Sequence, residues 1–175
     1  IKYTIKALYI LLKINILAIS GGLQTYGFYD IYINNINEKP TDIILSNNSI
    51  NENKIIGTII GELTTIDDDN NQIIPETFTY SVNNNNFAIN GNQLISNTVF
   101  DYETKKNYDI QIKSIDTGNN SIIKNFTINI LNVNEIPTNI TLSNNTIKEN
   151  KQVGSFIGTL KTEDVDSNIF IYSVN

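Results

Sequence analysis

The stretch from Leu131 to Asn150, LNVNEIPTNITLSNNTIKEN, repeats most of a stretch that lies 97 residues earlier in the chain. The earlier stretch, from Asn34 to Asn53, reads NNINEKPTDIILSNNSINEN. Both copies keep a glutamate two residues before a proline, and both end in Glu-Asn. Self-similarity at a fixed period is typical of a tandem array of domains. A period of about a hundred residues suits one β-sandwich domain for each repeat.

The repeat continues on both sides of this stretch. GTIIGELTTIDDD (57–69) matches GSFIGTLKTEDVD (154–166), and TYSVN (79–83) matches IYSVN (171–175) after a five-residue deletion. Upstream, FYDIYINNINE (28–38) parallels NFTINILNVNE (125–135). We therefore predict three units: the C-terminal part of a preceding repeat (1–37), a complete repeat (38–134) and the N-terminal part of a following repeat (135–175).

The residues of the complete repeat indicate about seven short strands and no helix. DIILS (42–46) and IIGTIIGELTTI (55–66) are rich in β-branched residues, and YDIQIKSI (108–115) alternates apolar and polar positions. Asn90-Gly91 predicts a two-residue hairpin turn, because both residues tolerate positive φ. Turns rich in Asn, Asp and Gly separate the strands. This pattern predicts an all-β antiparallel sandwich.

The composition excludes several kinds of function. The chain has 18 Asp and Glu against 12 Lys and Arg, and an acidic chain without a basic run is a poor nucleic-acid binder. It contains no cysteine and no histidine, which excludes disulfides, thiolate metal sites and a histidine-based hydrolytic triad. Asp101 and Glu103 resemble a glycosidase acid pair, but no other feature of the sequence predicts a sugar cleft. We expect neither an enzyme nor a small-molecule substrate.

The apolar segment from Ala7 to Ser20, ALYILLKINILAIS, has two interpretations. Lys2 and Lys6 precede it, as basic residues precede the apolar core of a signal peptide. Alternatively, it is a buried strand pair of the preceding repeat, because LAISGG (17–22) parallels KSIDTG (113–118). The repeat favours the strand. As a membrane-spanning helix the segment is short and is interrupted by Lys13 and Asn15.

Five motifs occur in an order and at a spacing that resemble a known family. They are Glu-Asn at 52–53 and 149–150, Asp-x-Asp at 67–69 and 164–166, Phe-Asp-Tyr-Glu at 100–103, Asp-x-Gly at 116–118, and an Asn-x-Asn-Glu-x-Pro linker at 35–40 and 132–137. Essentially the whole chain resembles a tandem of cadherin repeats, of the kind found in large bacterial surface proteins. The resemblance implies seven-stranded Greek-key sandwiches that bind Ca²⁺ at the joints between repeats.

The resemblance also implies the ligands of two joints. The main joint, at Pro137, takes residues from the complete repeat, the linker and the following repeat: Glu52, Asp101, Glu103, Asn134, Glu135, Asp164 and Asp166. A weaker joint, at Pro40, takes Asn37, Glu38, Asp67, Asp69 and Asp116. Ca²⁺ prefers six to eight oxygen ligands, which converging carboxylates supply, whereas Mg²⁺ keeps more of its waters.

Some residues depart from the family pattern. The linker of the family usually begins with Asp, and here Asn35 and Asn132 stand at that position. In the partial first copy, KYTIKALY (2–9) stands where DYETKKNY (101–108) stands later, so Lys2 and Thr4 replace two acids. We therefore expect the Pro40 joint to bind fewer ions than the Pro137 joint, or none.

Taken together, these features predict a calcium-binding segment of a secreted or cell-surface protein, acting in cell adhesion or as a spacer stiffened by Ca²⁺. The alternative is a passive, calcium-independent spacer array with the same fold. The expected partners are other cell-surface proteins or copies of the chain itself, as in homophilic adhesion. Any membrane attachment is expected outside this segment, and the expected location is extracellular.

Overall fold

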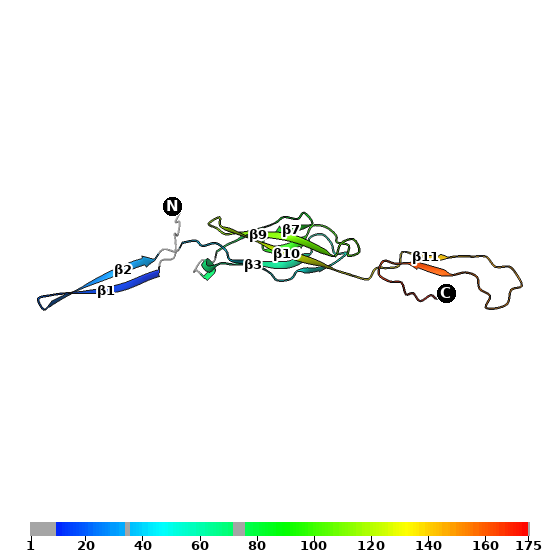
Figure 1. Cartoon of the computed structure of the whole chain (residues 1–175), viewed down its shortest axis with the longest axis horizontal. Coiled ribbons are helices and arrows are strands. Elements are labelled where there is room, and N and C mark those ends of the chain that lie inside the picture. The colour runs from blue at the N-terminus through cyan, green and yellow to red at the C-terminus, as the bar shows by residue number, and fades with distance from the viewer. Residues whose placement is uncertain (1–9, 34–35, 72–75, 175) are drawn as a thin grey trace.

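The computed structural model describes residues 10–33, 36–71 and 76–174. Two four-stranded sheets form the central sandwich (Figure 1). In sheet order, one contains β4 (Ser49–Asn51), β10 (Ser121–Leu131), β9 (Asn107–Ile115) and β6 (Thr79–Val82), and the other contains β3 (Asp42–Leu45), β5 (Ile59–Ile66), β8 (Gln93–Ser96) and β7 (Phe87–Asn90). All neighbouring pairs are antiparallel except β4 and β10, which are parallel. The predicted all-β sandwich is confirmed.

The core lies between the two sheets and follows the alternation in the sequence. Ile110 and Ile112 on β9 and Ile128 and Ile130 on β10 lie on the same side of their sheet and belong to one buried cluster with the apolar residues of the opposite sheet. Tyr108 closes one end of the core, with its ring centroid 5.7 Å from that of Phe87 and 5.1 Å from that of Phe100. Edge-on contacts of this kind add to the stabilisation from apolar burial.

The sandwich contains one strand that was not predicted, β4, which follows β3 along the chain. Asn47 donates hydrogen bonds from Nδ2 to the carbonyl oxygens of Ser49 (2.8 Å) and Ile60 (2.7 Å). This turn moves the chain from one sheet to the other, so that β3 pairs with β5 while β4 pairs with β10. A Cβ at Gly61 would collide with the backbone of Asn47, so only glycine fits this close approach.

The turn that joins β7 to β8 lies one residue later in the chain than the predicted turn at Asn90-Gly91. The loop consists of Gly91 and Asn92, because Asn90 is the last residue of β7 and pairs with Gln93. Gly91 has a φ of 62° and Asn92 has no positive φ, as in a type II′ turn, which requires glycine only at its first position.

Two further two-stranded sheets lie beyond opposite ends of the sandwich (Figure 1). β1 (Ile10–Ser20) pairs with β2 (Leu23–Ile33) through a turn at Gly21 and Gly22. Ile10–Ser20 is thus a strand, as that interpretation predicted, and residues 7–9 lie outside the described residues. The strand is not buried as expected, because β1 and β2 form a separate two-stranded sheet, and Ile16, Leu17 and Ile19 are 50%, 44% and 61% exposed. β11 (Asn139–Leu142) pairs with β12 (Leu160–Glu163). Where the repeats begin and end stays a prediction.

Local backbone conformations recur at the repeat spacing. Asn53 and Asn150 have φ of 60° and 63°, and Gly57 and Gly154 have φ of 89° and 83°. A hydroxyl pair also recurs: Thr65 Oγ1 donates to the Tyr80 hydroxyl at 2.9 Å, and Thr162 Oγ1 donates to the Tyr172 hydroxyl at 2.9 Å. The two copies thus share turn geometry as well as sequence.

The only helical segment in the described part of the chain is a single 3₁₀ turn, η1 (Asp68–Asn71), which Asp67 separates from β5. None of the described residues forms a helix with the length and apolar character needed to span a membrane.

Candidate metal centre

Glu52 is the most deeply buried acid at the C-terminal end of the sandwich, with 1% of its surface exposed. It directly follows β4, whose parallel pairing with β10 places it beside the outgoing linker. Its Oε2 accepts a hydrogen bond from Tyr102 N at 2.6 Å, and its Oε1 accepts one from Val133 N at 2.8 Å. The carboxylate therefore connects the loop after β8 to the linker.

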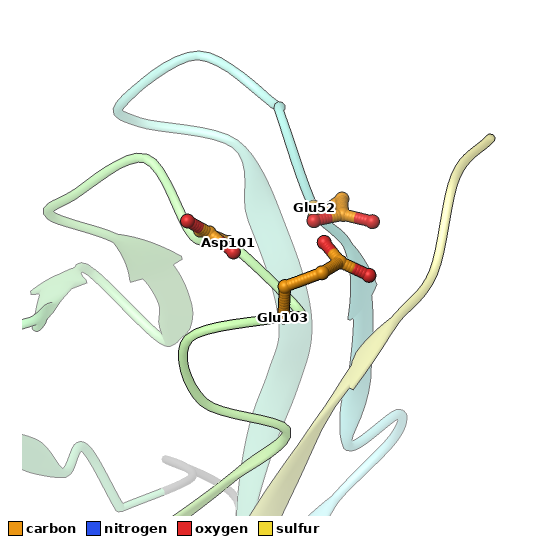
Figure 2. A group of neighbouring side chains, drawn as sticks. All are labelled: Glu52, Asp101 and Glu103. Carbon is orange, nitrogen blue, oxygen red and sulfur yellow. The ribbon is translucent and has the colours of Figure 1, made fainter. Parts of the chain in front are cut away.

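Asp101 and Glu103 lie in the loop between β8 and β9. Asp101 accepts hydrogen bonds from Thr104 N (2.9 Å) and Thr104 Oγ1 (2.8 Å), which lower the pKa of its carboxyl group. One carboxylate oxygen each from Glu52, Asp101 and Glu103 lies within 4.8 Å of the other two. Figure 2 shows the Glu52 carboxylate, from the segment after β4, close to those of Asp101 and Glu103, from the loop between β8 and β9.

A second group of acids crosses the joint at Pro137. Oxygens of Glu103, Glu135 and Asp166 also lie within 4.8 Å of one another, and they come from the sandwich, the linker and the segment after β12. Glu135 N donates to Asp166 Oδ2 at 2.6 Å, while the buried Oε2 of Glu135 has no hydrogen-bond partner among the residues that the structure describes. Glu103 belongs to both groups and thus connects them.

The acids of this joint influence one another's ionisation. Burial, followed by repulsion from Glu52, Asp166 and Asp101, raises the pKa of Glu103. The hydrogen bond from Asn53 lowers the pKa of Glu135, but its contact with Asp166, burial and the charge of Glu52 together raise it. The backbone N–H of Glu135 and the amide of Asn132 lower the pKa of Asp166.

These shifts predict a pH dependence in calcium-free buffer. A raised folded-state pKa gives stability that is present below the usual value of 4.5 and is lost as the pH rises through the folded-state value. The melting temperature without calcium should therefore fall as the pH rises from about 4.5 through the raised pKa values of Glu103 and Glu135. The lowered pKa values of Asp101 and Asp166 give stability that is present above the usual value of 3.8 and is lost only as the pH falls below it, so they do not affect this trend.

Circular dichroism melting curves across this pH range check the prediction, with Glu103→Gln as the comparison because it removes one raised group. The Glu103→Gln variant should show a shallower fall. With excess Ca²⁺ the trend should reverse, since metal binding requires deprotonated ligands. A calcium-free melting temperature that rises with pH would contradict the assignment of raised pKa values.

Five of the seven residues predicted for the Pro137 joint lie in these two groups, and two do not. Asp164 accepts hydrogen bonds at Oδ1 from Asp166 N (2.8 Å) and Ser167 N (2.9 Å), so it shapes the turn that presents Asp166. Asn134 donates from Nδ2 to the carbonyl oxygen of Glu135 at 2.9 Å. Both lie at the joint, outside the acid groups.

Asn132 and Asn53 are joint residues that the sequence analysis did not include among the ligands. Asn132 Nδ2 donates to Asp166 Oδ1 at 2.8 Å and to Glu103 Oε1 at 3.3 Å, and Asn53 Nδ2 donates to Glu135 Oε1 at 2.6 Å. Asn132 stands where the family usually has Asp, and Asn53 belongs to the repeated Glu-Asn motif. The signal for both was thus present in the repeat.

The N-terminal end of the sandwich gathers the acids predicted for the Pro40 joint. Asp67, Asp69 and Asp116 are each 5% exposed. Glu38 N donates to Asp69 Oδ2 at 2.9 Å, and Asn37 Nδ2 donates to Asp116 Oδ2 at 3.0 Å. Burial, then repulsion and hydrogen bonding from Asp69, raises the pKa of Glu38. Asp69 N in turn donates to Asp67 Oδ1 at 3.0 Å, and Asn37 Nδ2 donates to the carbonyl oxygen of Glu38 at 3.1 Å. Hydrogen bonds therefore link all five residues predicted for this joint.

The chemistry of both ends fits a hard divalent cation. Every ligand candidate is an oxygen, which is the donor atom that Ca²⁺ prefers. Three buried carboxylate oxygens lack a hydrogen-bond partner among the described residues: Asp67 Oδ2, Glu76 Oε2 and Glu135 Oε2. Buried polar atoms are normally paired, so such atoms call for a missing partner such as an ion or water.

A polar groove of about 590 Å³ lies on the outer face of β9 and β10. Its lining contains one carboxylate, Asp109, which accepts a hydrogen bond from Thr127 Oγ1 at 2.6 Å. Asp101 and Glu103 do not line it, so the groove lacks the two facing carboxylates of a glycosidase.

No protein-family model matches the chain. Protocadherin-1 of Homo sapiens is 28% identical over 168 residues, which cover 89% of this chain and 16% of that protein. The extracellular domain of protocadherin gamma B4 is 22% identical, with a TM-score of 0.55, and covers 94% of this chain and 27% of its own. Human protocadherin-24 EC1-2 is 16% identical, with a TM-score of 0.53, and covers 70% of this chain and 66% of its own. The expected resemblance to cadherin repeats and the expected sandwich fold are confirmed.

Proposed function

We propose that this chain, whose repeats are of the cadherin type, is an extracellular segment whose joints are stiffened by Ca²⁺. The main support is the position of Glu103, which contributes to one acid group within the sandwich and to a second that crosses the Pro137 joint. A bound Ca²⁺ supplies the positive charge that offsets the repulsion among these carboxylates. Glu52, Asp101, Glu103, Glu135 and Asp166 would hold it.

The protein's own residues orient the site before any ion binds. Glu52 fixes the linker through Val133 N, and Asp166 fixes it through Glu135 N. Asn132 and Asn53 hold the outer carboxylates with their amide groups. With an ion present, the amide of Asn132 can rotate to present its oxygen, because the two ends of the amide have nearly the same shape. The neutral amide also makes this joint less negative than the Asp of the family pattern would.

In this proposal the chain acts in adhesion or as a rigid spacer. The extracellular location expected from the sequence agrees with the relatives, which are named as extracellular cadherin domains. The chain spans only 16% of the curated relative it matches, so binding to other cell-surface proteins or to copies of itself is part of the proposal. The relatives are named for cadherin domains and not for an enzymatic activity.

A calorimetric Ca²⁺ titration of the whole chain tests the proposal, with Mg²⁺ as the control. Saturable binding with a dissociation constant of roughly 10⁻⁴–10⁻³ M or tighter is expected, as in extracellular calcium modules. Mg²⁺ should bind more weakly, because it keeps its waters and demands octahedral geometry. Neither binding heat nor a calcium-dependent melting temperature would leave the passive spacer array as the function.

A further inference from the structure

We propose that Glu76 is a metal ligand and that, with Asp67 and Asp69, it forms a divalent-cation site contained within the middle repeat. One oxygen from each of these carboxylates lies within 4.8 Å of the other two. Asp67 is the residue directly after β5, Asp69 lies in η1, and Glu76 lies shortly before β6. The inference rests on the proposed function, since it specifies one of the cation sites, but it assigns a ligand that the repeated motifs do not contain.

The strongest indication is the pair of buried oxygens without partners. Asp67 is 5% exposed, and its Oδ1 accepts a hydrogen bond from Asp69 N at 3.0 Å. Glu76 Oε1 accepts hydrogen bonds from Thr117 Oγ1 (2.7 Å) and Thr117 N (3.1 Å). The second oxygen of each side chain, Asp67 Oδ2 and Glu76 Oε2, is buried and has no hydrogen-bond partner within the described part of the chain. Each side chain is thus fixed by one oxygen and presents the other.

The repeat shows why this position matters. Aligning TYSVN (79–83) with IYSVN (171–175) places Glu76 opposite Asn168, so the following repeat lacks the acid. At the Pro137 joint the acids that accompany Asp166 come from the sandwich and the linker, namely Glu103 and Glu135. At the Pro40 joint, Thr4 stands at the position of Glu103 and cannot supply a carboxylate. Glu76 provides the third carboxylate from within the repeat instead.

The two ends of the repeat therefore differ in what an ion would connect. An ion at the Pro137 joint ties two repeats together through shared ligands. An ion held by Asp67, Asp69 and Glu76 would tie β5, η1 and the start of β6 to one another, and Thr117 would extend the connection to the turn after β9. Its main effect should be to stabilise the middle repeat itself.

The test uses the whole chain with Glu103→Ala, which removes the acid shared by both groups at the Pro137 joint. Calorimetry should still detect one Ca²⁺ site in this background. Adding Glu76→Gln should weaken that site by at least about tenfold, since even loss of a residue that only supports a ligand weakens metal binding by roughly 10- to 100-fold. The control is Glu62→Gln, which changes an exposed acid on β5 and should leave the affinity unchanged.

Melting temperatures separate a ligand from a purely structural residue. Without Ca²⁺, Glu76→Gln should leave the melting temperature unchanged or raise it, because it removes a negative charge from among Asp67 and Asp69. With Ca²⁺ it should lower the melting temperature. A residue that only accepts hydrogen bonds from Thr117 would lower it equally in both conditions. If the glutamine variant fails to fold, Glu76→Asn replaces it, because Asn168 occupies the equivalent position in the following repeat.

Each outcome has a distinct meaning. If the wild-type chain binds Ca²⁺ but the Glu103→Ala chain binds none, the inference is overturned and the proposed function stands. If the Glu103→Ala chain binds one ion and Glu76→Gln changes neither its affinity nor the calcium-dependent melting, Glu76 is not a ligand and the inference is again overturned. If the wild-type chain binds no Ca²⁺, the proposed function fails and the inference fails with it.

Discussion

Replacing Glu52 with alanine should lower the free energy of unfolding of the middle repeat by about 3 kcal/mol, even without calcium. Glu52 is 1% exposed, and its carboxylate accepts hydrogen bonds from two backbone N–H groups, those of Tyr102 and Val133. Hydrogen bonds to a charged group contribute roughly 1.5–3 kcal/mol each. A loss of this size corresponds to a fall in melting temperature of more than about 10 °C for a domain of this size.

Urea unfolding in calcium-free and calcium-containing buffer measures this effect. The loss should be larger with Ca²⁺, because the alanine variant also lacks a ligand of the Pro137 joint. Glu52→Gln should be intermediate, since its amide oxygen can accept one of the two hydrogen bonds while its NH₂ group faces the other donor. Glu62→Ala, at an exposed position on β5, is the matched control and should behave like the wild type. A Glu52→Ala variant as stable as that control would show that the buried carboxylate does not fix the linker.

Calcium should narrow the distribution of distances across the Pro137 joint, and a chelator should broaden it. The chain contains no cysteine, so a pair of introduced cysteines can be spin-labelled without interference. Exposed Glu62 on β5 and exposed Lys161 on β12 lie on either side of the joint. Without an ion, repulsion among Glu103, Glu135 and Asp166 opposes the closed joint, whereas a bound divalent cation would hold the two repeats together.

Pulsed electron–electron double resonance measures the distribution of distances between the two spin labels. A second pair, at Glu62 and Asn125 within the sandwich, should give the same distribution with and without Ca²⁺. Combining Glu103→Ala with Asp166→Ala should give a broad distribution across the joint even when Ca²⁺ is present. A distribution that Ca²⁺ leaves unchanged in the wild-type chain would favour the passive spacer.

The sequence predicted the fold well because its repeat and its alternation both report on local structure. The alternation from Tyr108 to Ile115 placed Ile110 and Ile112 in the core, where they are found. The additional strand β4 was not predicted, because it depends on the turn in which Asn47 bonds to the distant Ile60. The hairpin turn at Gly91 was displaced by one residue, because pairing with β8 and not the dipeptide alone sets the register.

The repeat indicated some acids of the site and not others. Asp67 and Asp69 stand at repeated positions, so the repeat alone indicated them. Glu76 does not, because the following copy has Asn168 at the aligned position. Its proximity to Asp67 depends on the path of the chain between β5 and β6, which sequence spacing does not reveal. Asp164 and Asp166 form one repeated motif, yet only Asp166 joins an acid group.

The parallel pairing of β4 and β10 has a mechanical consequence for a chain pulled from its two ends. Tension applied through the linker enters the sandwich at Leu131, the last residue of β10 and the partner of Asn51. Because β4 lies beside β10 along the direction of pulling, its hydrogen bonds carry the force in shear, several at once, instead of opening one after another. The bond from Val133 N to Glu52 extends this sheared region beyond the strand. Resistance to extension is therefore concentrated at the acid groups, where repeats meet.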